Sequence, residues 1–163
     1  MIINQFGNYL CQKIIEGADP IILSAIINQI NEQLVFISLN VHGTRSIQTL
    51  IEKLACNINH DLKSEEVSDD VKFINHCNLT KVINALNSQI VDLTMNMHGN
   101  HVLQQFLMVF QYTNSDLTTK EYANSEMYTQ FIFDACMTNI ISIGKHKHGC
   151  CVMQRCLEKG TWI

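Results

Sequence analysis

The strongest constraint on the fold is a segment that occurs four times, each time with a glycine followed by the same order of apolar and polar residues. The copies read FGNYLCQKIIE from Phe6, HGTRSIQTLIE from His42, HGNHVLQQFLM from His98 and HGCCVMQRCLE from His148. The residues after the glycines stand at 8, 44, 100 and 150, so the steps are 36, 56 and 50 residues. Such periods are typical of solenoids, in which each unit packs against its neighbours.

The composition favours helices throughout. One proline and seven glycines in 163 residues, 47% of them hydrophobic, fit helices joined by short turns around a continuous core. Between the copies, residues 20–39, 71–86 and 127–143 have apolar residues at helical spacing and are expected to be packing helices. The sequence therefore predicts an all-α fold.

Two insertions explain the longer steps. The acidic segment 57–70 and the polar segment 112–126 lack helical periodicity, and we expect both to be surface loops. The units are then 1–36, 37–70, 71–126 and 127–163, with the first and last incomplete.

A helical wheel separates two roles within the repeated segment, counting the residue after glycine as position zero. Positions two, three, six and seven form an apolar arc that we expect in the core: Leu10, Cys11, Ile14, Ile15; Ser46, Ile47, Leu50, Ile51; Val102, Leu103, Phe106, Leu107; Val152, Met153, Cys156, Leu157. Positions zero, one and four form a second arc that we expect to face outward: Asn8, Tyr9, Gln12; Thr44, Arg45, Gln48; Asn100, His101, Gln104; Cys150, Cys151, Gln154.

The outward arc has the chemistry of a nucleobase site. Glutamine stands at position four in all four copies, whereas a merely solvated face would vary among polar residues. The planar side chains of Tyr9, Arg45 and His101 stand beside these amides. A flat side chain next to a donor and acceptor is what reading an unstacked base requires.

The net charge of −4 does not exclude a nucleic acid, because it is concentrated in one place. Residues 61–70 hold five acidic residues and one lysine, which leaves the remainder neutral. Four basic residues flank the outward arc and are candidates for phosphate contacts: Lys13, Lys145, Lys147 and Arg155.

The segments GNYLCQ, HGTRSIQ, GNHVLQ and HGCCVMQRCLE resemble the second to fifth repeats of the eight-repeat Pumilio (PUF) family. The resemblance covers nearly the whole chain apart from the insertions. It implies a curved right-handed solenoid of about four three-helix repeats, with single-stranded RNA antiparallel to the protein on the concave face. The three family repeats that read a U-G-U element are absent.

The resemblance also implies a base code. In the family, Asn with Gln pairs with uracil, Cys or Ser with Gln pairs with adenine, and Ser with Glu pairs with guanine. Asn8 with Gln12 and Asn100 with Gln104 then read U, and Cys150 with Gln154 reads A. Thr44 with Gln48 is assigned A with tolerance for other bases. The expected RNA is 5′-AUAU-3′ with a loose third base, and Tyr9, Arg45, His101 and Cys151 stack against it.

Partners and location follow from the same resemblance. Family members bind 3′ untranslated regions in the cytoplasm and recruit repressors or deadenylases, so we expect post-transcriptional repression or mRNA decay. Four bases bind weakly, and the apolar residues Ile2, Ile3, Leu157 and Trp162 lie near the incomplete ends. A homodimer through these ends would restore about eight reading positions.

Three alternatives are weaker or remain open. A zinc site at His146, His148, Cys150, Cys151 and Cys156 has the wrong spacing, because the repeat already explains His148. A helical scaffold for proteins would share the core pattern without explaining the glutamines. A Pumilio-like ribosomal RNA binder would have degenerate base-reading positions. No catalytic motif, cofactor site, signal peptide or membrane span is expected.

Overall fold

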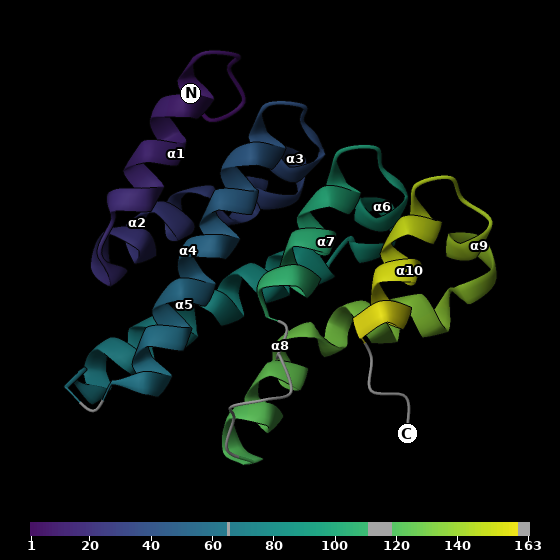
Figure 1. Cartoon of the computed structure of the whole chain (residues 1–163). Helices are drawn as coiled ribbons and strands as arrows, with labels where there is room; N and C mark the ends of the chain where they lie inside the picture. Colours follow the sequence, from purple (N-terminus) through teal and green to yellow (C-terminus); the bar gives the residue numbers. More distant parts are fainter. Residues whose placement is uncertain (65, 111–118, 160–163) are drawn as a thin grey trace.

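The computed structural model of the protein describes residues 1–64, 66–110 and 119–159, with the backbone alone at 119–127 and 159. These residues form helices and contain no strand, which confirms the predicted all-α solenoid (Figure 1). The elements are α1 (Gly7–Gly17), α2 (Pro20–Ile30), the 3-10 turn η1 (Asn31–Gln33), α3 (Leu34–Leu39), α4 (Gly43–Lys63), α5 (Asp69–Asn87), α6 (Ile90–Met95), α7 (Gly99–Val109), α8 (Thr119–Thr138), α9 (Ile140–Gly144) and α10 (Gly149–Lys159).

The helices form three rows that run along the solenoid. The repeated segments make the repeat helices α1, α4, α7 and α10, each packed against the next. The packing helices α2, α5 and α8 form a second row, and the short helices α3, α6 and α9 form a third. Figure 1 shows the repeat helices side by side in chain order, so equivalent positions recur at each step along the molecule.

Apolar residues of all three rows join in one continuous core. Ile47, Leu50, Ile51 and Leu54 of α4 are completely buried, because this helix has neighbours on both sides. Burying one such side chain stabilises the fold by about 1.5–3 kcal/mol. The solenoid is therefore held together by contacts between successive units.

The expected loop at 57–70 is wrong in part, because most of this segment is helical and only the stretch between Lys63 and Asp69 joins the two helices. Helix α4 continues to Lys63, and α5 already begins at Asp69. Ser68 caps α5 by accepting a hydrogen bond from the Val71 backbone N–H, and acidic residues are favourable in the first turn of a helix. Between the two helices, the buried Asn75 side chain donates to Asp61 Oδ2 at 2.8 Å.

The expected loop at 112–126 is also wrong in part, because α8 begins at Thr119; residues 111–118 lie outside the described residues. The boundaries expected at 36/37, 70/71 and 126/127 fall inside α3, α5 and α8. Hydrophobic periodicity locates helices better than it locates their ends, and the polar helix starts concealed these junctions. Each internal unit consists instead of a short helix, a repeat helix and a packing helix.

One stretch, Pro20–Leu39, is long and apolar enough to cross a membrane by length and composition alone. In the structure it is divided among α2, η1 and α3 rather than forming one straight helix. Leu23, Ile27 and Leu34 within it are completely buried in the core. Packing within the solenoid accounts for these buried residues, whereas Ile21, Ile22 and Phe36 of the same stretch are exposed.

In the second, third and fourth repeats, the glycine permits a close approach between the short helix and the repeat helix. A Cβ at Gly43 would collide with the carbonyl oxygen of Ile37, at the end of α3. A Cβ at Gly99 would lie 2.9 Å from the carbonyl oxygen of Leu93, at the equivalent place in α6. Only a residue without a side chain lets the repeat helix begin so close to the short helix.

We therefore predict that Gly43→Ala lowers the free energy of unfolding by about 1–3 kcal/mol, because the backbone must move to relieve the overlap. Gly17→Ala is the matched control, because a Cβ there meets nothing within 4 Å. Alanine favours helix over glycine, so the control should be neutral or slightly stabilising. Urea unfolding followed by circular dichroism measures both, and equal stabilities of the two variants would contradict this account of the repeat.

Candidate nucleic-acid interface

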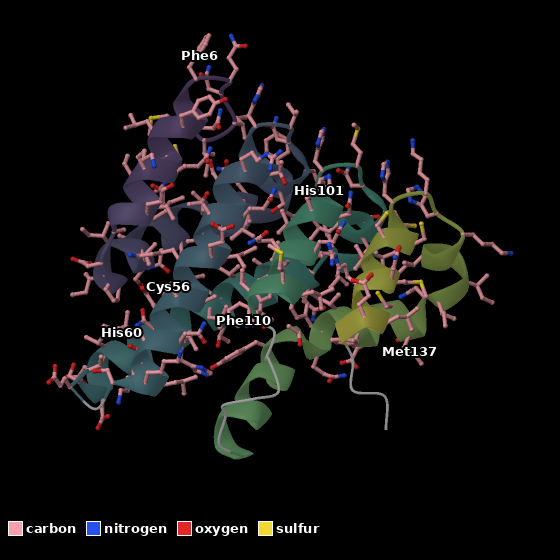
Figure 2. The ribbon with its side chains drawn as sticks, in the orientation of Figure 1. Phe6, Cys56, His60, His101, Phe110 and Met137 are labelled. Carbon is pink, nitrogen blue, oxygen red and sulfur yellow. The ribbon has the colours of Figure 1, made fainter. Side chains whose placement is uncertain are left out.

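The outward arc of the repeat helices forms a row along the first turns of α1, α4, α7 and α10. At position one, Tyr9, Arg45, His101 and Cys151 are exposed, as expected. At position four, Gln12, Gln48 and Gln104 are half-buried and Gln154 is exposed. Figure 2 shows side chains along this edge of the molecule, with His101 labelled on α7.

Position zero differs from the expectation that it faces outward. Asn8, Thr44 and Asn100 are only 3%, 4% and 2% exposed, whereas Cys150 is exposed. The reason is the loop before each helix. Asn8 Nδ2 donates to the carbonyl oxygen of Asn4 at 2.9 Å, and Asn100 Nδ2 donates to that of Asn96 at 2.7 Å. A helical wheel takes no account of this loop, which folds back over position zero.

The residues at positions zero and four bond to each other in three repeats. Gln12 Nε2 donates to Asn8 Oδ1 at 2.9 Å, and Gln104 Nε2 donates to Asn100 Oδ1 at 2.7 Å. A side-chain amide also has an oxygen acceptor, so each glutamine retains Oε1 for an incoming group. In these two pairs the buried asparagine is fixed by its hydrogen bond to the preceding loop, and it in turn fixes the half-buried glutamine.

The second repeat has less hydrogen-bonding capacity to offer. Thr44 Oγ1 donates to the carbonyl oxygen of His98 at 3.2 Å, which joins α4 to the loop before α7. It also accepts a hydrogen bond from Gln48 Nε2 at 3.3 Å. A hydroxyl has one donor, so Thr44 has none left for a base. Selectivity at this position would therefore depend on Gln48 and on the shape of the threonine methyl group.

The fourth repeat lacks the internal bond. Gln154 Nε2 donates to Glu158 Oε1 at 3.4 Å, because the thiol of Cys150 is a poor acceptor. The sulfur atoms of Cys150 and Cys151 both lie against the carbonyl oxygen of Lys147, at 3.4 and 3.8 Å. Burial, followed by the neighbouring Cys150, raises the pKa of the Cys151 thiol, so this thiol stays protonated and acts as a small apolar surface.

The structure also shows a residue type that the sequence analysis missed. An asparagine three residues before the glycine holds each of the first three corners, where a corner is the loop directly before a repeat helix. Asn96 Oδ1 accepts hydrogen bonds from the backbone N–H groups of His98 at 2.8 Å and Gly99 at 3.0 Å. Asn4 and Asn40 do the same, and in the fourth corner His146 Nδ1 accepts from the His148 N–H. The recurring N-x-x-G in the sequence was the available signal.

The basic residues fall into two groups. Lys13 pairs with Glu16 at 2.6 Å and Arg155 pairs with Glu158 at 3.0 Å, and surface pairs of this kind contribute little to stability. Lys145 and Lys147 are exposed in the last corner. Desolvation, then the positive charges of Lys147 and the neighbouring histidines, lowers the pKa of His148. This end of the row therefore carries two exposed lysines beside His148.

The five residues of the zinc alternative do not form one cluster, although the rings of His146 and His148 are neighbours, with centroids 5.7 Å apart. Cys156 is buried and its thiol contacts Cys136, which together with burial raises its pKa. Cys150 and Cys151 are instead exposed beside Lys147. Within the described part of the chain, no three His, Cys, Asp or Glu side chains could share a metal ion.

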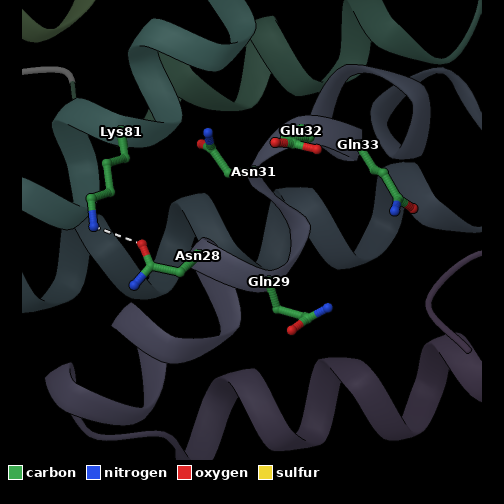
Figure 3. A pocket seen from close by; sticks show the side chains of 6 residues that line it. All are labelled: Asn28, Gln29, Asn31, Glu32, Gln33 and Lys81. Atoms are coloured by element: carbon green, nitrogen blue, oxygen red, sulfur yellow. Dashed lines mark hydrogen bonds between the residues drawn. The ribbon is translucent and has the colours of Figure 1, made fainter.

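A polar pocket lies elsewhere, between α2, η1 and α5 (Figure 3). In it, Lys81 Nζ donates to Asn28 Oδ1 at 2.7 Å. Its lining comes from the packing row and η1, with no repeat helix: Asn28, Gln29, Asn31, Glu32, Gln33 and Lys81. The pocket is therefore separate from the row of amide pairs.

The chain is similar in sequence to known proteins over nearly its whole length. The Pumilio-family RNA binding repeat matches residues 1–30, 33–55, 89–111 and 139–161. A Pumilio domain-containing protein of Schizosaccharomyces pombe is 35% identical over 161 residues, which are 99% of this chain and 19% of that protein. The suppressor protein MPT5 of Saccharomyces cerevisiae is 31% identical over 163 residues, 99% of this chain and 16% of that protein.

Solved structures show the same likeness. The Puf4 RNA binding domain bound to the HO endonuclease RNA 3′ UTR recognition sequence superposes with a TM-score of 0.69 at 33% identity, covering 98% of this chain and 39% of that one. The RNA-binding domain of yeast Puf5p bound to MFA2 RNA superposes with a TM-score of 0.69 at 29% identity, covering 98% and 36%. The chain thus spans about a fifth of the curated relatives and about two fifths of these domains.

The corner asparagine gives a second testable prediction. Asn96→Ala removes an acceptor from two backbone N–H groups and should lower the free energy of unfolding by about 1–2 kcal/mol. Asn84→Ala, on the exposed side of α5, is the control and should change stability little. Chemical denaturation measures both variants. If Asn96→Ala were as stable as the control, the corner would not depend on this side chain.

Proposed function

Because the chain belongs to the Pumilio family of RNA-binding repeat proteins, we propose that it binds single-stranded RNA in a sequence-specific way, one base at each repeat helix. The observation that carries the proposal is the repeated pair at positions zero and four, held by hydrogen bonds on the accessible row. Beside each pair stands an exposed side chain suited to stacking.

The proposed RNA is 5′-AUAU-3′, in which α10 reads the first base and α1 the last. The fixed amides of Asn8 with Gln12 and Asn100 with Gln104 support the two uracils, since their geometry is set before RNA arrives. The small exposed thiol of Cys150 leaves room for a purine at the first base. Because the Thr44 hydroxyl already donates to His98, we expect weak base selectivity at the third position.

Charge supports this placement of the RNA. Lys145 and Lys147, exposed at the α10 end of the row, are proposed to contact phosphates. Lys13 and Arg155 are further candidates whose glutamate partners would have to release them. The acidic residues lie at the far end of α4. Nineteen residues separate Thr44 from Lys63, a rise of about 28 Å, which exceeds the Debye length of about 8–10 Å. They therefore repel RNA on the row only weakly.

We further propose that the protein acts on mRNA 3′ untranslated regions in the cytoplasm, through repressor or deadenylase partners, and that copies pair to present about eight reading positions. The solved structures support the 3′ untranslated region as target, because the Puf4 RNA binding domain is bound to an RNA 3′ UTR recognition sequence. The intact amide pairs favour base reading over a ribosomal RNA binder that contacts structured RNA, and over a protein scaffold that needs no such pairs.

The test is fluorescence anisotropy with a labelled oligocytidine carrying one AUAU box, against oligocytidine alone, at near-physiological salt. We expect preference for the AUAU box, and Gln104→Ala should weaken it about tenfold by removing a base contact. Gln29→Ala, an exposed glutamine of the packing row, is the matched control and should bind normally. Equal binding to both RNAs, or equal behaviour of the two variants, would rule out base reading by the row.

A further inference from the structure

Four of the seven histidines stand at one junction of the solenoid, between the third and fourth repeat helices. His98 and His101 belong to the corner and the first turn of α7, and His146 and His148 belong to the corner before α10. Helices α7 and α10 pack against each other, so the two pairs of side chains come from neighbouring units. Both sides of this junction are formed by units within the chain.

Contacts within the fourth corner separate the roles of its two histidines. The rings of His146 and His148 are neighbours, with centroids 5.7 Å apart. His146 Nδ1 accepts a hydrogen bond from the His148 backbone N–H at 3.3 Å, and a ring nitrogen that accepts carries no proton. His146 is therefore neutral as long as it holds the corner. The half-buried ring of His148 has no hydrogen-bond partner among the described residues, so its nitrogens can bind a ligand.

The side chains that act on His148 are all basic. Desolvation lowers the pKa of His148, and the side chains that lower it further come from both units of the junction: Lys147, His146, His101 and His98. Without an anion nearby, His148 thus gives up its proton more readily than an isolated histidine does. A bound anion would have the opposite effect, because a negative charge favours the protonated imidazole.

No carboxylate offsets these basic groups within the described part of the chain. Asp92 of α6 is the acidic residue on the short and repeat helices that α10 contacts, and it is not among the groups that act on His148. Helix α9 has no titratable side chain. In the first turn of α10, the sulfur atoms of Cys150 and Cys151 lie against the carbonyl oxygen of Lys147. The junction therefore lacks the negative charge that a phosphate would bring.

We propose that the histidines of this junction, centred on His148, form a phosphate site that takes up a proton when RNA binds. The protonated imidazole would donate a charge-assisted hydrogen bond to a phosphate oxygen, beside the positive charge of Lys147. His101, labelled on α7 in Figure 2, connects this site to the row, because it is also the side chain proposed to stack on a base. The proposal rests on the proposed function, in which the strand passes from α10 to α7 and carries one phosphate between the two bases read there.

The direction of the pH dependence follows from the two states of His148. Its pKa is lowered in the free protein and is raised by the phosphate in the complex. At a pH above both values the imidazole is neutral with or without RNA, so it does not affect affinity. As the pH falls between the two values, only the complex is protonated, and binding tightens by up to about tenfold for each unit of pH. Below both values the gain is complete.

Fluorescence anisotropy with the labelled oligocytidine carrying one AUAU box, at about pH 6 and about pH 8, tests the phosphate site. We expect binding about fivefold to tenfold tighter at the lower pH. His148→Gln cannot take a charge and should lose most of this gain. His148→Lys is charged at both pH values, so at about pH 8 it should bind nearly as tightly as the unaltered chain does at about pH 6. Both variants keep the backbone N–H that His146 binds, so both should fold.

His60→Gln, in the exposed last turn of α4, is the matched control and should keep the full pH dependence. Equal affinities of the unaltered chain at the two pH values, or an unchanged pH dependence in His148→Gln, would overturn the phosphate site. Oligocytidine alone separates this site from base reading, because every RNA has phosphates. The same pH dependence without preference for the box would leave the phosphate site standing and remove base reading. Preference for the box with no pH dependence would do the reverse.

Discussion

The row of candidate base-reading residues depends on the corner, the loop directly before each repeat helix. In the second to fourth corners the backbone of the glycine lies against the last turn of a short helix, too close for any side chain. In the first three corners an asparagine accepts hydrogen bonds from free N–H groups at the start of the repeat helix. Because three asparagine corners share this geometry, and a histidine replaces asparagine in the fourth, the repeat helices begin at equivalent places. Their first turns then form a row.

The corner also sets the chemistry of the row. The loop that supplies the cap also accepts hydrogen bonds from the Asn8 and Asn100 side chains, which fixes these amides before any ligand arrives. Preorganised groups lose little conformational entropy on binding, so a small number of contacts can still be selective. The second and fourth repeats depart from this arrangement. In the second, the Thr44 hydroxyl already donates to His98, and in the fourth, the thiol of Cys150 replaces the amide. The four repeat helices therefore differ in how strictly each could select a base.

The sequence predicted the helical rows and the recurring glutamine, because both follow from periodicity that packing imposes on each unit. It did not predict the helical part of 57–70, since acidic composition suggested a loop while Ser68, Asp69 and Asn75 in fact start and anchor α5. It also placed Asn8, Thr44 and Asn100 on the surface, because a wheel describes one helix without the loop above it. Contacts between elements distant in sequence, such as that between Thr44 and His98, leave no local pattern in the sequence from which they could be predicted.

The central claim is that each repeat helix reads its own base through positions zero and four. The most direct measurement replaces Asn100 by Ser and Gln104 by Glu in one chain and compares binding to AUAU and AGAU boxes. The account predicts that preference at the second base alone changes from U to G, by about tenfold, while the other bases are read as before. Equal loss of binding to both RNAs, or an unchanged preference for U, would contradict it.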